Sequence, residues 1–181
     1  LKVQEGEQET GEADFVVLAP NKGIFIIEVK GGGLQFKDGQ WYSVWGPNKR
    51  RINSPHAQAK DNAFAIRAKL RKSFPGNPDG FTNTLITWGC VFPSQAYNAV
   101  GSEFEDEKWR VWDANSFYHD IKDFIELLHI KNIAKLKSKD RKFKLPSELD
   151  IEKYSKFLRR DFEIPKLLKS HGDAIDKKIH K

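Results

Sequence analysis

The feature that most constrains the fold is a pair of short apolar segments joined by a turn, within residues 13–30. Residues 13–19 (ADFVVLA) alternate well enough for a strand, and residues 24–30 (IFIIEVK) are apolar and rich in β-branched side chains. The PNKG tetrapeptide between them consists of residues that favour turns, and three glycines follow at 31–33. This pattern predicts a β-hairpin that ends abruptly at the glycines.

The rest of the chain predicts further strands and then helices. Asp-Gly at 38–39 is a strong hairpin signal, and Ser54 followed by Pro55 is typical of a helix start. The apolar run at 84–92 has the length of a buried central strand. We expect residues 1–12 to form a loop, with strands at 34–37, 40–45, 49–52, 84–92 and 108–112, and helices at 55–73, 114–130 and 147–162. This order predicts an α/β or α+β core in which helices pack on a mixed sheet.

Length and composition set the broad class. A chain of 181 residues fits one domain, with room for a small helical appendage. No apolar run approaches the roughly 18 residues of a membrane-spanning helix, and no signal peptide is apparent. The single cysteine, Cys90, cannot form an internal disulfide, so we expect a reducing cytoplasm. Because the chain starts at Leu1 and has no methionine, we also expect it to be a fragment.

The charge balance indicates the kind of partner. The net charge is +6 and the pI is about 9.3, which favours a polyanion such as nucleic acid. Many soluble proteins are nevertheless basic without binding one, so the charge alone leaves both interpretations open.

Two charged residues at the end of the second apolar segment carry the chemistry. Glu28 and Lys30 are two residues apart, so they project from the same face of a strand. A hairpin loop of three or five residues would place Asp14 opposite one of them, whereas a four-residue loop would require a bulge. Two converging carboxylates would hold a hard cation such as Mg²⁺, and a neighbouring lysine would position or deprotonate a water. Glu-x-Lys alone is also a frequent surface pattern.

The blocks GEADFVVLAPNKGIFIIEVKGGG, SPHAQA and VFP resemble the nuclease-related domain (NERD) family, which is placed within the PD-(D/E)XK nuclease superfamily. The resemblance covers roughly residues 10–115, and the gapless hairpin block is its specific part. It implies a restriction-endonuclease-like α/β fold, with a NERD-like core at 1–115 and a basic helical extension at 116–181 that could lead into a further domain. A typical member opens with a helix that carries another glutamate, and here only an acidic loop stands in its place.

The resemblance also implies a role for each residue of the hairpin. Asp14 and Glu28 would be metal ligands, the Val29 carbonyl would be a further ligand, and Lys30 would be the catalytic lysine. Glu12 matches a recurrent acid of the family and would lie on the same strand face as Asp14, as a ligand or as a support for the ligands.

Residues outside the hairpin are weaker candidates. Gln58 matches a glutamine that members of the superfamily aim at the site, although a solvent-exposed helix residue is the plain alternative. Arg50, Arg51 and Lys60 could contact backbone phosphates, which position a substrate without reading its sequence, or could simply be solvated. The five tryptophans could stack on unpaired bases, but core or edge packing is the interpretation that we prefer.

These residues together predict a metal-dependent nuclease that hydrolyses DNA phosphodiester bonds with a water activated by Mg²⁺ or Mn²⁺. The alternative is a non-cleaving module that binds DNA and tethers a fused or associated helicase, and a third interpretation is a structural domain with a decayed site. The glycines at 31–33 lack the Gly-Lys-Ser/Thr ending of a phosphate-binding loop, so we expect no small-molecule cofactor. Because no apolar run is long enough to span a bilayer, we also expect no membrane partner.

Overall fold

The computed structural model describes residues 2–3, 11–74, 83–98, 100–102, 104–116 and 119–158, and only the backbone at 2–3 and 11–12. Its centre is a four-stranded mixed sheet in the order β3-β4-β8-β9. β3 (Phe15–Ala19) is antiparallel to β4 (Gly23–Val29). β8 (Ile86–Phe92) and β9 (Val111–Asp113) continue the sheet in the direction of β4. The prediction of a mixed sheet flanked by helices is therefore confirmed, and it is consistent with a restriction-endonuclease-like fold.

The β3–β4 hairpin closes with a three-residue loop. Ala19 pairs with Gly23, which leaves Pro20, Asn21 and Lys22 between the two strands. Asn21 has φ 58° and Gly23 has φ 148°, two values that ordinary side chains disfavour. At Gly23 a Cβ would also lie 2.8 Å from the carbonyl oxygen of Leu85. A three-residue loop is one of the two lengths that we expected to put Asp14 in register with Glu28 or Lys30, and the pairing itself extends to Phe15 and Ile27.

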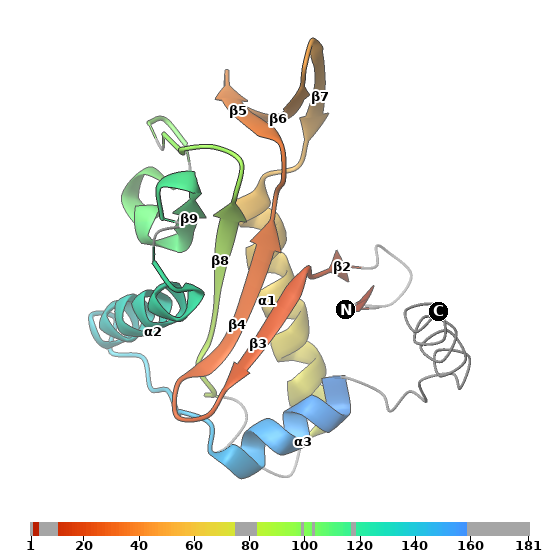
Figure 1. Cartoon of the computed structure of the whole chain (residues 1–181). Coiled ribbons are helices and arrows are strands. Elements are labelled where there is room, and N and C mark those ends of the chain that lie inside the picture. Colours follow the sequence, from red (N-terminus) through yellow and green to blue (C-terminus); the bar gives the residue numbers. More distant parts are fainter. Residues whose placement is uncertain are drawn as a thin grey trace, which may run out of the picture.

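An antiparallel meander of three strands extends beyond the end of β4 (Figure 1). It consists of β5 (Gly33–Lys37), β6 (Gln40–Trp45) and β7 (Asn48–Ile52), as the turn signals predict. Asp38 and Gly39 have φ values of 52° and 71°, which is the backbone of a type I′ hairpin turn. Trp41 holds the meander to the body of the protein: it is 3% exposed and packs against Phe36, Phe92, Tyr97 and Phe104.

Helices cover both faces of the sheet (Figure 1). α1 (Pro55–Ser73) starts at a Ser54 cap, as predicted, and packs over Ile24 and Ile26 together with α3 (Glu148–Leu158). α2 (Ile121–Lys137) lies on the other face, against Phe25 and Ile27. Close packing of α2 requires Gly89, because a Cβ there would lie 2.8 Å from Phe124.

Several element boundaries differ from the predicted ones. Residues 2–3 and 11–12 form short paired strands, β1 and β2, rather than part of a loop. The predicted strand at 108–112 is mostly a 3₁₀ turn, η1 (Glu105–Arg110), before β9. The helix expected at 114–130 is wrong in position, because η2 (Ala114–Ser116) precedes it and Asp120 caps the helix that begins at 121. α3 is described to 158, and the rest of the predicted helix lies outside the described residues. Among the described helices, none combines the length and apolarity needed to cross a membrane.

Candidate active site

Asp14 and Glu28 lie at the open end of the hairpin, where the pairing of β3 with β4 stops. The last pair is Phe15 with Ile27, and Asp14 and Glu28 are each one residue beyond it. The Asp14 side chain is fixed there because its Oδ2 accepts a hydrogen bond of 2.7 Å from the backbone N–H of Val29. The carboxylate of Asp14 is exposed, and it lies beside the last residues of β4. The structure therefore places two acids at one edge of the site.

Glu28 and Lys30 form an ion pair in the same place. Lys30 Nζ lies 2.6 Å from Glu28 Oε1, and the Glu28 side chain is 4% exposed while that of Lys30 is 26% exposed. Burying a carboxylate costs several kcal/mol without a counter-charge, so the ammonium group offsets a large desolvation penalty. Glu28 shares the face of Ile24 and Ile26, which pack under α1. The site thus opens on the α1 side of the sheet.

The segment from Lys30 to Leu34 is held by the end of β8 and by the loop that follows it. The Lys30 N–H donates to the Val91 carbonyl at 3.0 Å, and the Gly32 N–H donates to Ser94 Oγ at 3.1 Å. Gln95 makes two hydrogen bonds with the backbone of Leu34, at 2.6 and 2.9 Å. Sequence analysis did not single out Ser94 or Gln95, because their partners lie about sixty residues away and only the topology brings them together.

Gln58 is the fourth residue of α1 and is half-buried. α1 packs against β4 and β8. α1 also contacts the backbone of β2. Gln58 Oε1 is buried and has no hydrogen-bond partner among the described residues. A buried amide oxygen that lacks a partner is uncommon and calls for a ligand or water.

The donor set at the hairpin fits a hard divalent cation. The carboxylates of Asp14 and Glu28 and the carbonyl of Val29 are oxygen ligands, which Mg²⁺ and Mn²⁺ prefer. No group of three or more His, Cys, Asp or Glu side chains gathers within the part of the chain that the structure describes. The Glu12 side chain lies outside that part, although its backbone pairs with Lys2. Two carboxylates suffice for Mg²⁺, since this ion keeps several of its waters.

The three basic candidates are not brought together. Arg50 and Arg51 are consecutive exposed residues of β7, so they project from opposite faces of the meander. Arg50 pairs across the sheet with Ser43, and Arg51 pairs with Tyr42. Lys60 is exposed on α1, two residues after Gln58 and therefore on a different side of the helix.

The tryptophans and the cysteine serve mainly as packing residues. Trp41 and Trp112 are 3% and 4% exposed, and Trp88 and Trp109 are half-buried. Trp45 is the exception at 64% exposed, and it covers Gly32, where a Cβ would lie 2.6 Å from its ring. Cys90 is fully buried, as expected for a packed residue.

Comparison with known proteins identifies the family to which these residues belong. The family model of the nuclease-related domain, NERD, matches residues 1–93. The match includes the whole hairpin, α1 and β8, and it ends one residue after β8. No curated protein and no solved structure matches the chain significantly. Because the family model covers half of the sequence, including Asp14, Glu28 and Lys30, this chain belongs to the NERD family, whose general context is the PD-(D/E)XK superfamily.

Proposed function

We propose that this NERD domain is a divalent-metal nuclease that hydrolyses phosphodiester bonds in DNA. Membership in the family implies a nuclease-related function, and the proposal adds catalysis, the metal and the substrate. The observation that carries it is that Asp14 accepts a hydrogen bond from the Val29 N–H, next to Glu28, whose carboxylate lies 2.6 Å from Lys30 Nζ. A structural role alone does not explain why a buried acid and a lysine are placed beside an exposed acid at a strand end.

The ligand residues are held before any metal binds. Asp14 and Glu28, with the Val29 carbonyl, would hold Mg²⁺ or Mn²⁺. The Val29 N–H donates to Asp14 Oδ2, and the carboxylate is exposed, so it has lone pairs left for a cation. When bound, the cation would polarise a phosphoryl oxygen and lower the pKa of a water. Such fixed ligands avoid the cost of ordering them during the reaction.

Lys30 and Gln58 would act on the water and on the phosphate. The Lys30 ammonium is a flexible point charge that is 26% exposed, so Nζ can leave Glu28 and donate a hydrogen bond to a phosphate oxygen. Gln58 Oε1 is a buried acceptor, and accepting a hydrogen bond from the attacking water would satisfy it. The hydrogen bonds of Ser94 and Gln95 keep the strand end that carries Lys30 in place.

The DNA is drawn to the protein by charge. The net charge of +6 attracts a polyanion at long range, and exposed Arg50 and Arg51 on the meander would contact backbone phosphates. The use of a single cysteine fits the reducing cytoplasm in which we propose that the enzyme acts.

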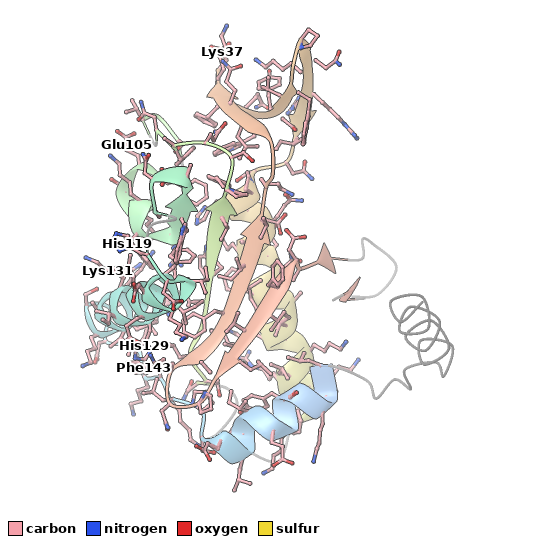
Figure 2. The ribbon with its side chains drawn as sticks, in the orientation of Figure 1. Lys37, Glu105, His119, His129, Lys131 and Phe143 are labelled. Carbon is pink, nitrogen blue, oxygen red and sulfur yellow. The ribbon has the colours of Figure 1, made fainter. Side chains whose placement is uncertain are left out.

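A cleavage assay tests the proposal. Three proteins are compared: wild type, Lys30→Ala and a matched control, Lys37→Ala. Each is incubated with linear, circular or single-stranded DNA in the presence of Mg²⁺, Mn²⁺ or EDTA. Lys37 is exposed at the tip of the meander, far from the hairpin site (Figure 2). We expect metal-dependent cleavage that Lys30→Ala loses and Lys37→Ala keeps.

The same assay separates the nuclease from a tethering module. Salt-sensitive DNA binding without cleavage under either metal would contradict catalysis, and would favour a module that recruits a fused or associated helicase.

A further inference from the structure

A large cavity lies at the sheet edge that β9 leaves uncovered. β9 pairs with Cys90, Val91 and Phe92, so the first half of β8 has no strand neighbour on that side among the described residues. The cavity there has a volume of about 590 Å³ and is bounded by α1, β8, the end of α2 and residues 141–143. Phe143, in the segment after α2, forms part of the wall (Figure 2). This volume is in the range of small-molecule sites.

Some of the cations around the cavity have structural roles. Arg110 is 1% exposed, and its Nη1 donates to the Trp88 carbonyl at 2.7 Å and to Thr87 Oγ1 at 3.1 Å. Arg67 Nη2 donates to the Ile86 carbonyl at 3.4 Å. These hydrogen bonds satisfy the open edge of β8. Glu107 supplies the counter-charge for Arg110 and for Lys135.

Other cations around the same cavity have no such explanation. Arg71, Lys139, Arg141 and Lys142 line it, and none of them forms an ion pair within the described part of the chain. Aspartate and glutamate are absent from the lining residues described. Burial is the main reason that the pKa of Arg67 is lowered, and repulsion from the positive charges of Arg71 and Arg141 lowers it further. A bound phosphate would relieve this repulsion through charge-assisted hydrogen bonds.

Aromatic side chains line the other end of the cavity. Phe64 is 51% exposed, and its ring lies 6.1 Å from that of Trp88. Phe64 precedes Arg71 by two helical turns, or about 10 Å along α1. This separation matches the distance between the base and the phosphates of an extended nucleotide.

We propose that this cavity binds a nucleotide that carries phosphate groups at its 5′ end. The base lies against the exposed Phe64 ring beside Trp88, and the phosphates lie among Arg71, Arg141 and Lys142. A free nucleoside triphosphate and the 5′-phosphorylated end of a DNA strand share this chemistry. The cavity uses none of the hairpin residues and lies on the side of α1 away from Gln58, so the inference does not depend on the proposed nuclease activity.

Isothermal titration calorimetry in EDTA tests the proposal with the full chain. The probes are deoxyadenosine triphosphate, inorganic triphosphate, and tetranucleotides with or without a 5′ phosphate. The variant is Arg71→Ala with Arg141→Ala, and the matched control is Lys72→Ala with Lys131→Ala. Both control lysines are exposed, and Lys131 lies on α2 outside the cavity (Figure 2). Circular dichroism confirms folding, and Phe64→Ala tests the base contact at an exposed residue.

We expect saturable 1:1 binding of the nucleoside triphosphate, of the phosphorylated tetranucleotide, or of both. The arginine pair should weaken it by at least about tenfold, while the lysine pair changes it by less than about twofold. Phe64→Ala should weaken nucleotide binding and leave inorganic triphosphate unchanged. Three results would overturn the proposal. The first is no saturable binding of the nucleoside triphosphate or of the phosphorylated tetranucleotide. The others are a loss of affinity in the lysine pair equal to that in the arginine pair, and an affinity for inorganic triphosphate equal to that for the nucleotide. Because no metal is present, loss of cleavage activity cannot imitate any of these outcomes.

Discussion

The backbone N–H of Val29 donates a 2.7 Å hydrogen bond to Oδ2 of Asp14, so a side chain continues the hairpin where the strand pairing ends. Asp14 therefore has two separable roles, in holding the hairpin and in carrying charge. Asp14→Asn keeps an acceptor oxygen for Val29 and loses the charge, whereas Asp14→Ala loses both. We expect both variants to lose metal-dependent cleavage.

Their stabilities should differ. We expect the free energy of unfolding of Asp14→Ala to be about 1 kcal/mol lower than that of Asp14→Asn, because the alanine leaves the Val29 N–H without its partner. Urea unfolding of the two variants measures this difference. Equal stability would show that the hydrogen bond contributes nothing to the hairpin, and residual cleavage by either variant would remove Asp14 from the metal site.

Glu28→Gln should weaken metal binding while leaving the fold intact. The amide keeps the shape of the side chain but loses the charge that would hold a cation, so we expect cleavage to fall at least about hundredfold. Wild-type protein should gain thermal stability when Mg²⁺ is added, because a ligand that binds only the folded state stabilises it. Glu28→Gln should lose this gain, measured as the shift in Tm with Mg²⁺. Glu148→Gln, at an exposed position in α3, is the matched control and should keep it.

Glu107 is the acid that balances the cations beside the edge of β8. Burial alone would raise its pKa, but hydrogen bonds and charge from Lys135 and Arg110 leave the pKa of this carboxyl below its ordinary range. Glu107→Gln would leave Arg110, which is 1% exposed and stacked over Trp88, without its counter-charge. We expect a loss of about 3 kcal/mol in the free energy of unfolding. Urea unfolding beside the exposed control Glu105→Gln measures it, and a loss as small as that of the control would contradict the role of this pair.

Local signals explain which parts of the fold were predictable. α1 begins and ends where predicted, because the Ser54 cap, Pro55 and the apolar spacing are all encoded within the helix. Asp14, Glu28 and Lys30 could be chosen as candidates for the same reason, since they belong to one short block. α2 was placed several residues too early, because nothing in the residues before Asp120 distinguishes η2 from a first helical turn.

Tertiary contacts explain what sequence analysis missed. Gln95 holds Leu34 across about sixty residues of chain, and the basic cavity takes Arg71 from α1 and Arg141 from the segment after α2. Residues so far apart carry no shared pattern in one sequence, since only the parallel pairing of β4 with β8 brings their elements together.

Asp150, near the start of α3, makes the stability of the protein depend on pH. Burial raises the pKa of Asp150, but hydrogen bonds from the Ser147 N–H and hydroxyl, both 2.9 Å, and the Lys144 charge leave it below its ordinary value. A carboxyl with a lowered pKa in the folded state contributes stability that is full above its unfolded pKa of about 4. That contribution disappears as the pH falls through the lower pKa of the folded state.

The free energy of unfolding of wild type should therefore exceed that of Asp150→Asn by about 1 kcal/mol near pH 7, and this difference should close below about pH 4. Urea unfolding of both proteins across this range measures it, with Asp61→Asn, an exposed position in α1, as the control. A gap that stays constant down to about pH 3 would show that the hydrogen bonds of Ser147 stabilise α3 without depending on the charge of Asp150.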